Sequence, residues 1–448
     1  MAILSEQEAK KILKKVISYS KADSCECNLS GVVSGNIRYA RNTVTTSGSV
    51  SDLTLSVQSA YGKKVGTATI NEFDDASLEK VVRRSEELAK LAPENPEYMP
   101  PLKSAKFKKA NTHFNSTASV TPEYRAKAAE NSIVPSKKNK LIAAGFLNDS
   151  ENMLALMNSN GLFAYNTSTS VDFSATIRTE DGKGSGWVTR DYSDVKKLNT
   201  AEASKIAIQK ALDSSDAKEL EPGRYTVILE PAASIQLLQN MAGSMDQRSA
   251  EEGRSFLSYK PKDDEKNPPK TKLGMKLFDE RVNIYTDPNH PEVPTPHFSS
   301  DGAPVERIQW VKNGKVVTMP NSRYWAEKTK TDYVPTPAGG LQFIMEGGDE
   351  SIEEMIKNTR RGILVTRLWY IRQLDPQSLL YTGLTRDGTF FIENGKIKYP
   401  IKNFRFNESP IVMLNNIEAL GKPFRINGCM VPPMKIRDFT FSSLSDAV

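Results

Sequence analysis

The spacing of hydrophobic and polar residues predicts alternating helical and strand-rich segments in the first half of the chain. A capping box beginning at Ser5 precedes apolar residues at helical spacing over 12–17, which predicts a first helix. From about residue 25 to 70, apolar and polar residues alternate with a period of two, which is typical of strands, and a Gly-Lys-Lys turn at 62–64 predicts a hairpin there. A second helix is predicted at about 76–92, because its apolar residues share one face and a proline follows.

A similar order of elements returns about 120 residues later. Asn160-Gly161 and Asp181-Gly182 are typical of hairpin turns, and a helix is predicted from about Ala201 to Leu212. Few residues are identical between the two stretches, so the pattern leaves open whether they arose by duplication. We assign residues 1–215 to an N-terminal α+β region, with two related units at about 1–100 and 120–215 as one interpretation of it.

The second half, residues 222–448, is predicted to be a β-rich domain. A polar segment ending in Pro222-Gly223 predicts the boundary. A strand at 225–230 follows, and then a helix from Pro231 through Met245. The stretch 259–272 is rich in Pro, Lys and Asp and is predicted to be an exposed loop.

Strong local signals continue toward the C-terminus. Asn-Gly pairs at 313–314 and 394–395 predict two hairpins. Between them, a capping box at Ser351 predicts a helix with arginines in its last turn and Gly362 at its C-cap, leading into a strand at 363–371. The predicted fold class is therefore α+β: a strand-rich N-terminal domain with two hairpin-helix units and a β-rich C-terminal domain.

Composition narrows the class of protein. The chain has 448 residues with a formal net charge of +6 and 38% hydrophobic residues, which is typical of a folded globular protein. No apolar run approaches the roughly 20 residues of a membrane span. The first residues carry acids and lysines in place of the apolar core of a signal peptide. With three cysteines in the whole chain, we expect a cytoplasmic protein without a disulfide scaffold.

Positive charge is concentrated between Lys103 and Lys140. This segment holds nine Lys and Arg residues and two acids, Glu123 and Glu130, so its net charge of +7 exceeds the +6 of the whole chain. It has few aromatic residues for stacking on bases, which favours a solvated surface linker over a nucleic-acid site.

Residue chemistry alone does not identify a reaction. The chain has neither a nucleophile-elbow nor a phosphate-binding motif. His290 and His297 lie seven residues apart in a proline-rich stretch, which is no standard metal-ligand spacing. Cys25 and Cys27 are two apart on a predicted strand, so they are expected to share one buried face. Cys429 is expected to be a core residue.

A family resemblance is carried by motifs in the C-terminal half. These are Glu221-Pro-Gly-Arg-Tyr-Thr-Val-Ile-Leu-Glu-Pro231, Gly253-Arg-Ser-Phe-Leu257, Phe298-Ser-Ser-Asp-Gly-Ala-Pro304, Ser322-Arg-Tyr-Trp-Ala326 and Gly388-Thr-Phe-Phe-Ile-Glu-Asn-Gly395. They resemble the TldD/PmbA family, whose members have been described both as peptidases and as modulators of DNA gyrase. The resemblance is strong over 221–421 and weaker before it.

The resemblance implies a zinc-peptidase system. TldD-type subunits carry His-Glu-x-x-x-His on the helix after the opening strand, and a cysteine near the C-terminus completes the zinc site. Aligned on Gly253, the same positions here are 238–243, Leu-Gln-Asn-Met-Ala-Gly. These residues offer neither histidine nor glutamate, so this chain resembles the PmbA (TldE) branch, which lacks the motif.

The resemblance therefore implies a non-catalytic or divergent subunit of a metallopeptidase that processes unfolded peptides. The expected partner is a TldD-like subunit that carries the zinc, or a second copy of this chain in a homodimer. We expect no catalytic residue, no cofactor and no metal in this chain, no membrane contact and no nucleic-acid binding. Two alternatives stay open: an active metallopeptidase with relocated ligands, for which His290, His297 and Cys429 are the candidates, and a modulator of DNA gyrase.

Overall fold

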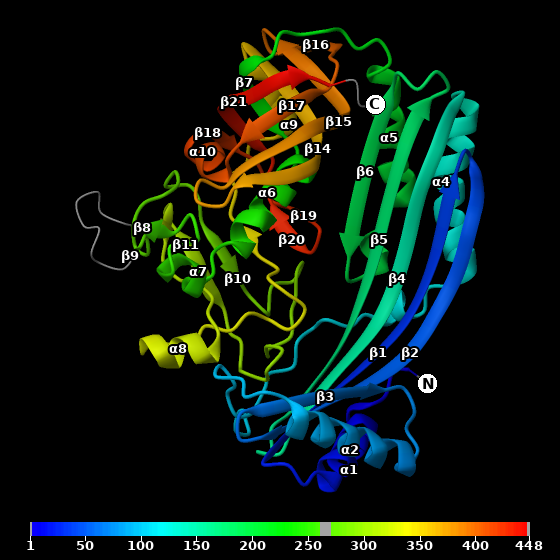
Figure 1. Ribbon diagram of the computed structural model, residues 1–448. Coiled ribbons are helices and arrows are strands. Elements are labelled where there is room, and N and C mark those ends of the chain that lie inside the picture. The colour runs from blue at the N-terminus through cyan, green and yellow to red at the C-terminus, as the bar shows by residue number, and fades with distance from the viewer. Residues whose placement is uncertain (1, 260–269, 446–448) are drawn as a thin grey trace.

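A long curved sheet and a β-rich C-terminal part face each other in the computed structural model, which describes residues 2–259 and 270–445 (Figure 1). The N-terminal helices are α1 (Glu6–Tyr19), α2 (Asp75–Leu91), α3 (Asn115–Ala118), α4 (Pro122–Lys138) and α5 (Thr200–Asp213), with a 3-10 turn η1 (Val195–Lys197). The N-terminal strands are β1 (Ser24–Ala40), β2 (Thr43–Tyr61), β3 (Lys64–Ile70), β4 (Leu141–Asn158), β5 (Phe163–Thr179) and β6 (Ser185–Tyr192).

The six N-terminal strands form one antiparallel sheet in the order β3-β2-β1-β4-β5-β6. The succession helix, three strands, helix occurs twice, as α1-β1-β2-β3-α2 and as α4-β4-β5-β6-α5, and the first strands of the two units pair at the centre. In both units a glycine of the third strand allows the closing helix to approach. A Cβ on Gly66 would lie 2.2 Å from the Ala89 nitrogen, and one on Gly186 would lie 2.1 Å from the Ala207 oxygen. The origin of the two units by duplication and the positions of the domain boundaries stay predictions.

All these helices pack on one face of the sheet. Odd-numbered residues of β1 and β4, such as Cys27 and Leu147, are buried against them. Cys25 and Cys27 are fully buried with their Sγ atoms 3.9 Å apart, which confirms that they share one buried face. Even-numbered residues therefore point toward the C-terminal part of the molecule.

The C-terminal part is built mainly from short strands. Its helices are α6 (Pro231–Gly243), α7 (Gln247–Glu251), α8 (Arg323–Thr329), α9 (Ile352–Lys357) and α10 (Pro410–Asn415). Its strands are β7 (Gly223–Leu229), β8 (Ser258–Tyr259), β9 (Lys270–Thr271), β10 (Ile284–Thr286), β11 (Ile308–Lys312), β12 (Lys315–Val316), β13 (Ile344–Met345), β14 (Arg361–Asp375), β15 (Leu380–Glu393), β16 (Lys396–Pro400), β17 (Phe404–Glu408), β18 (Ile417–Leu420), β19 (Phe424–Ile426), β20 (Cys429–Val431) and β21 (Met434–Leu444).

A small barrel organises this part. Strands β14, β7, β21, β17 and β15 are neighbours in that order, and the pairing of β14 with β15 closes the ring. The predicted α+β class, with its strand-rich N-terminal and β-rich C-terminal halves, is thus confirmed. Both Asn-Gly hairpins are present, as β11–β12 and β15–β16.

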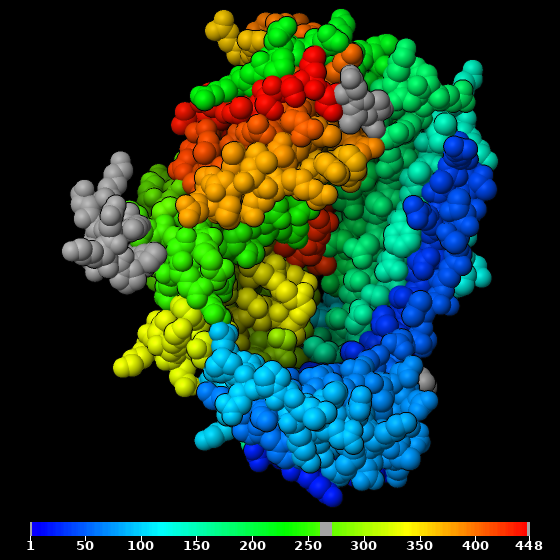
Figure 2. All heavy atoms as spheres, viewed as in Figure 1, coloured from blue at the N-terminus to red at the C-terminus, as the bar shows by residue number. Residues whose placement is uncertain are grey.

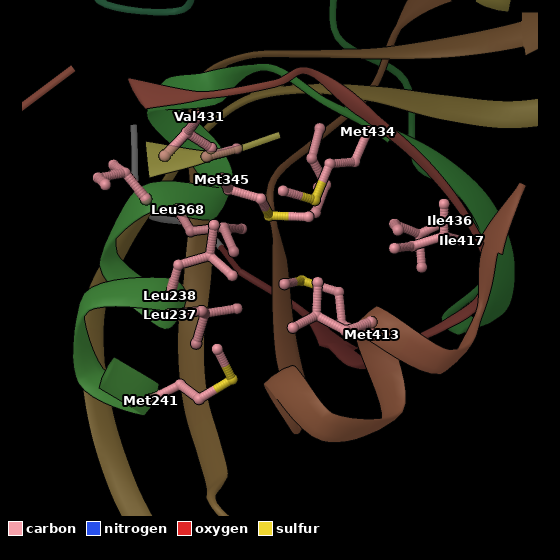
Figure 3. Packing of buried hydrophobic residues seen from close by; sticks show 14 of the residues in the cluster. Leu237, Leu238, Met241, Met345, Leu368, Met413, Ile417, Val431, Met434 and Ile436 are labelled. Atoms are coloured by element: carbon pink, nitrogen blue, oxygen red, sulfur yellow. The ribbon is translucent and has the colours of Figure 1, made fainter. Parts of the chain in front are cut away.

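Helix α6 lies between the barrel and the long sheet. Pro231 occupies its first turn, and its apolar side chains Leu237, Leu238 and Met241 are fully buried. Figure 3 shows them packed in one core with residues from several strands and from helix α10. These partners include Met345, Leu368, Met413, Val431 and Met434. The opposite, polar side of α6 is consequently turned away from the core.

Three predictions are corrected by the structure. The helix capped by Ser351 ends at Lys357, because Arg361 already pairs with Glu393 as the first residue of β14. Residues 122–138 form α4 rather than a linker, and this helix packs on β4 and α5 through small residues. Helix α6 ends at Gly243, two residues earlier than predicted. The predicted loop at 259–272 lies mostly outside the described residues.

No helix within residues 2–259 and 270–445 is long and apolar enough to cross a membrane.

Candidate functional site

A hollow separates the long sheet from the C-terminal part. Figure 2 shows it between the strands of the sheet and the barrel, with the β19–β20 hairpin at its back. The two parts touch at both ends of the sheet: β15 meets β6 and α5 at one end, and Phe298 and Ala338 pack on Leu156 at the other. Within the hollow, a cavity of about 510 Å³ lies where β6, α6, β14 and the β19–β20 turn meet.

The sheet presents a polar, mostly uncharged wall to this hollow. Its even-numbered residues on β1, β4 and β5 are largely amides and hydroxyls: Asn28, Ser30, Ser34, Asn36, Asn148, Ser150, Asn152, Ser170, Ser174 and Thr176. Strand β2 pairs with β3 only from Leu55 onward, so its residues 43–54 form an open sheet edge whose side chains are almost all exposed. A wall of this kind can hydrogen-bond peptide groups without selecting one apolar side chain.

The polar side of α6 carries three amides at the hollow. The Gln239 Nε2 donates to the Asn427 carbonyl at 3.3 Å and lies 3.8 Å from the Cys429 Sγ. The Gln236 Nε2 donates to the Asn240 Oδ1 at 3.2 Å, and both side chains line the cavity. These residues come from segments about 190 positions apart, which the β19–β20 hairpin brings together.

The structure refines which position of α6 meets Cys429. Sequence alignment pairs Leu238 and Gly243 with the two histidines of the zinc motif, but Leu238 is fully buried in the core. Because successive helical residues differ by about 100°, its neighbour Gln239 faces Cys429 instead. Gly243 lies one turn further on the same face, and a Cβ added at this glycine would meet only open space.

The residues present do not fit a zinc ion. Zinc takes thiolate, imidazole or carboxylate ligands, whereas α6 offers amides and a glycine here. Burial raises the pKa of the Cys429 thiol to about 11, which keeps it protonated at neutral pH. Over residues 2–259 and 270–445, no three His, Cys, Asp or Glu side chains gather closely enough to hold a metal ion.

The two candidate histidines are occupied by local contacts. His297 is 3% exposed, and its ring nitrogens lie 3.2 Å from the Val305 oxygen and 3.1 Å from the Asn289 Oδ1. The His290 Nδ1 accepts from the Glu292 nitrogen at 3.2 Å, and burial lowers the pKa of this imidazole. Among the described residues, they stay on their own loop and form no metal-binding group with Cys429.

The β19–β20 hairpin is anchored to the long sheet by a buried ion pair. The Arg425 Nε donates to the Asp191 Oδ2 at 2.9 Å, and the Gly428 nitrogen donates to the same oxygen at 2.9 Å. Asp172 lies on the neighbouring strand, opposite Asp191. Burial, and then the Asp191 charge, raises the pKa of Asp172 to about 6, against the influence of Arg425.

Part of the positive charge in the basic segment from Lys103 to Lys140 is paired with carboxylates. Arg125 is buried and holds Asp149 in a two-point ion pair, with Nε–Oδ1 at 2.6 Å and Nη2–Oδ2 at 2.8 Å. Lys108 pairs with Glu306 at 2.9 Å, and Lys127 pairs with Glu130 at 2.7 Å. Three of the nine basic side chains of this segment are therefore paired with a carboxylate.

The residues that β14 contributes to the cavity were not predicted from the sequence. Arg367, Trp369, Tyr370 and Arg372 line it together with Trp187 of β6. The signal was present as an unusual run of arginine and aromatic residues in a strand. It could not be interpreted without knowing that β14 faces β6 and α6.

Comparison with known proteins covers most of the chain. Three family models match: PmbA/TldA metallopeptidase domain 1 at residues 25–89, the central domain at 116–214, and the C-terminal domain at 222–443. Metalloprotease PmbA of Escherichia coli O157:H7 is 21% identical over 464 residues, covering 97% of this chain and 98% of the relative. A metalloprotease of Methanothermobacter thermautotrophicus is 22% identical over 303 residues, covering 62% of each chain. The chain thus spans less than two-thirds of that relative.

Solved structures share the fold. A Thermotoga maritima protein, described as a proposed modulator of a DNA gyrase, superposes with a TM-score of 0.85 at 16% identity, covering 97% of this chain and all of that chain. TldE from Thermococcus kodakarensis superposes with a TM-score of 0.84 at 15% identity, covering 98% of this chain and all of that chain.

Proposed function

The chain belongs to the PmbA/TldD metallopeptidase family, and from this premise we propose that it is the non-catalytic or divergent subunit of a peptidase that acts on unfolded peptides. The observation that carries the proposal is the polar side of α6. Beside Cys429 this helix presents the amide of Gln239, with Gln236 and Asn240 next to it. Amides bind zinc poorly and cannot act as a general base, so catalysis falls to a TldD-like partner that carries the motif.

On this proposal the chain's own residues hold the substrate. An unfolded peptide has unpaired backbone groups along its length, which the hydroxyls and amides of the sheet wall can satisfy. The open edge of β2 over residues 43–54 offers a second means of holding it, by addition of the peptide as a further strand. Both kinds of contact involve the peptide backbone rather than its side chains, which suits a subunit that accepts many peptide sequences.

The two alternatives receive less support from the molecule. Relocated zinc ligands would need His290, His297 and Cys429 to converge, and the described residues form no such group. A gyrase modulator that binds DNA would need a continuous basic face, whereas Arg125, Lys108 and Lys127 are each paired with a carboxylate. We therefore develop only the subunit hypothesis.

The test is reconstitution with a family member that carries His-Glu-x-x-x-His. The two proteins are measured alone and mixed at equal concentration, by light scattering after size exclusion, by zinc content, and by cleavage of a labelled unstructured peptide. We expect a stable mixed complex, zinc only where the motif-bearing chain is present, and cleavage that needs both chains. A partner whose motif glutamate is replaced by glutamine serves as the control for catalysis.

Two results would overturn the proposal. One is the absence of any association between the two chains. The other is stoichiometric zinc in this chain alone together with cleavage by this chain alone, which would make it an active peptidase with ligands placed elsewhere.

A further inference from the structure

The cavity beside α6 is lined by a concentration of aromatic rings. Trp187 of β6 and Trp369 and Tyr370 of β14 all contribute to its wall. The chain has four tryptophans, and the other two, Trp310 and Trp325, are 1% and 6% exposed. Trp187 and Trp369 are only half-buried, and Tyr370 is 54% exposed. The protein therefore keeps three large rings partly accessible at one cavity, although rings of this kind are otherwise placed in its core.

A bulge in β14 brings two of these rings to the same cavity. Successive residues of a regular strand point to opposite faces, so Trp369 and Tyr370 would not share a cavity if β14 were undistorted. The register with β15 shifts between Trp369 and Arg372, and Tyr370 has a φ of 55°, which is costly for a residue with a bulky side chain. Both rings consequently line the cavity, with their centres 5.3 Å apart. Bulges that re-aim side chains are over-represented beside functional sites.

Arginine side chains hold two of the rings in position. The Arg367 guanidinium lies 4.1 Å from the centre of the Trp187 ring, and that of Arg372 lies 4.6 Å from the centre of the Tyr370 ring. Stacking of this kind restricts the orientation of both partners. Rings that are already fixed lose little conformational freedom when a ligand packs against them.

The size of the cavity and the rest of its wall suit one large apolar side chain. Its volume of about 510 Å³ falls within the range of about 300–1,000 Å³ found for pockets that bind small molecules. Ile235 of α6, Leu368 of β14 and Ile426 of β19 supply aliphatic surface beside the rings. The amides of Gln236 and Asn240 line the same cavity and can bond the peptide groups that adjoin an inserted side chain.

We propose that this cavity binds an aromatic side chain of the peptide, so that the subunit anchors unfolded chains by a type of residue that folded proteins bury. An aromatic side chain can pack edge-to-face or offset against Trp369 and Tyr370, which an aliphatic side chain cannot reproduce. The inference rests on the proposed function, which supplies the peptide. It adds one preferred side chain to contacts that otherwise involve only the backbone.

An aromatic residue of a peptide fits the surroundings better than a base of a nucleic acid. Bases also stack on such rings, but each nucleotide brings a phosphate, which needs basic groups along its path. The exposed Asp172 lies opposite Asp191, and the pair is on the same face of the sheet as Trp187 and Thr189, which line the cavity. A carboxylate at this position repels a phosphate but not an uncharged peptide.

The experiment compares three unlabelled Gly/Ser decapeptides that differ only at one central position, which is Phe, Leu or Ala. Binding to the full chain is measured by titration calorimetry at two salt concentrations. We expect the Phe peptide to bind at least about tenfold more tightly than the Ala peptide, because burial and ring packing both favour it. It should bind about threefold more tightly than the Leu peptide, because only ring packing distinguishes the two. Salt should leave these preferences unchanged, since the contact is apolar.

Tyr370→Ala tests the residue assignment by removing the most exposed of the three rings. It should abolish most of the preference for Phe and leave binding of the Ala peptide unchanged, whereas Tyr370→Phe, which keeps the ring, should retain the preference. Tyr285→Ala is the matched control, because Arg307 stacks on Tyr285 at 4.1 Å but Tyr285 does not line the cavity. Gln236→Trp, at an exposed position of α6 that lines the cavity, should fill it and also remove the preference.

Each other outcome overturns the inference in a distinguishable way. Equal binding of the Phe and Ala peptides, or the same loss of preference in Tyr370→Ala and Tyr285→Ala, refutes the aromatic site and leaves the proposed function standing. Binding of the Leu peptide as tightly as the Phe peptide refutes the choice of an aromatic side chain. Binding of none of the three peptides refutes both the site and the peptide-holding role. Tighter binding of a single-stranded oligonucleotide than of the Phe peptide would assign the rings to bases instead.

Discussion

Arg425→Met should weaken the attachment of the β19–β20 hairpin to the long sheet by about 3–5 kcal/mol, the usual cost of breaking a buried ion pair from one side. The side chains of Arg425 and Asp191 are 9% and 10% exposed. Arg425 also donates to the Glu292 carbonyl, so its loss removes two contacts between elements distant in the sequence. Methionine is flexible enough to fill the space left behind, which confines the effect mainly to charge and hydrogen bonding.

The remaining carboxylate explains the size of this effect. After the substitution, the Asp191 Oδ2 keeps only the Gly428 nitrogen as a donor. Its Oδ1 is buried and has no hydrogen-bond partner among the described residues. An unpaired charge would thus stay in a poorly solvated position. Arg425 also opposes the rise in the pKa of Asp172, so its removal should raise that pKa above about 6.

The assay is urea unfolding followed by tryptophan fluorescence, combined with hydrogen exchange of residues 424–431. Lys197→Met is the matched control, because Lys197 and Glu292 join the same two parts of the chain at 2.8 Å but are 42% and 36% exposed. That exposed pair should contribute at most about 1 kcal/mol. The double variant Arg425→Met/Asp191→Leu removes both charges and should lose less stability than Arg425→Met alone.

A structural role for the ion pair is refuted if Arg425→Met lowers the free energy of unfolding no more than Lys197→Met does, or if the double variant is less stable than Arg425→Met. Either result would mean that the hairpin is held by apolar packing and that the ion pair contributes little.

Three further predictions test other parts of the molecule. The double variant Gln239→His/Gly243→His should bind zinc with Cys429 as a third ligand. Its zinc affinity should be at least about tenfold higher than that of Gln236→His/Asn240→His, which has the same spacing on α6 but no contact with Cys429. Equal zinc affinities of the two variants in a titration would contradict the placement of Cys429. Burial and the Asp301 charge raise the pKa of Glu26 to about 7, above its unfolded value of about 4.3. The ionised carboxylate therefore lowers the stability of the folded chain above pH 7, and this loss disappears as the pH falls toward 4. Glu26→Gln should therefore be more stable than the unmodified chain by about 1–3 kcal/mol at pH 8 and equal to it at pH 4 in denaturant titrations, and an equal gain at both pH values would exclude this cause. Arg125→Met should lower the free energy of unfolding by about 3–5 kcal/mol, because Asp149 stays buried without its partner. Lys127→Met, two residues further along, should lower it by at most about 1 kcal/mol. Equal effects of the two variants on thermal unfolding would count against a structural role for Arg125.

The features that the sequence predicts correctly are those in which the signal and the structure are both local. The capping boxes at Ser5 and Ser351 are present, and the predicted Asn-Gly turns join paired strands. Each depends on hydrogen bonds between residues a few positions apart, so the residues that decide it can be read together.

The features that were predicted wrongly are those that depend on packing by distant residues. Helix α4 was missed because its buried face consists of small residues such as Ala128 and Ser132 together with Arg125, and this pattern has no apolar stripe. The end of α9 was misplaced because Arg361 is captured by pairing with Glu393 of another strand. The first case reflects a buried face without an apolar stripe, and the second reflects pairing with a distant strand.

The sequence by itself determined the fold class, the family and the loss of the zinc motif, because each depends on which residue types occur in which order. Only the tertiary structure decided that Gln239, rather than Leu238, meets Cys429, and that Arg367 and Arg372 of β14 lie opposite Trp187 and α6. The rotation of a helix and the facing of two strands are set by how their apolar sides pack into a shared core. That core joins residues from the whole second half of the chain, and so the positions of the polar side chains at the site follow from contacts that no local pattern contains.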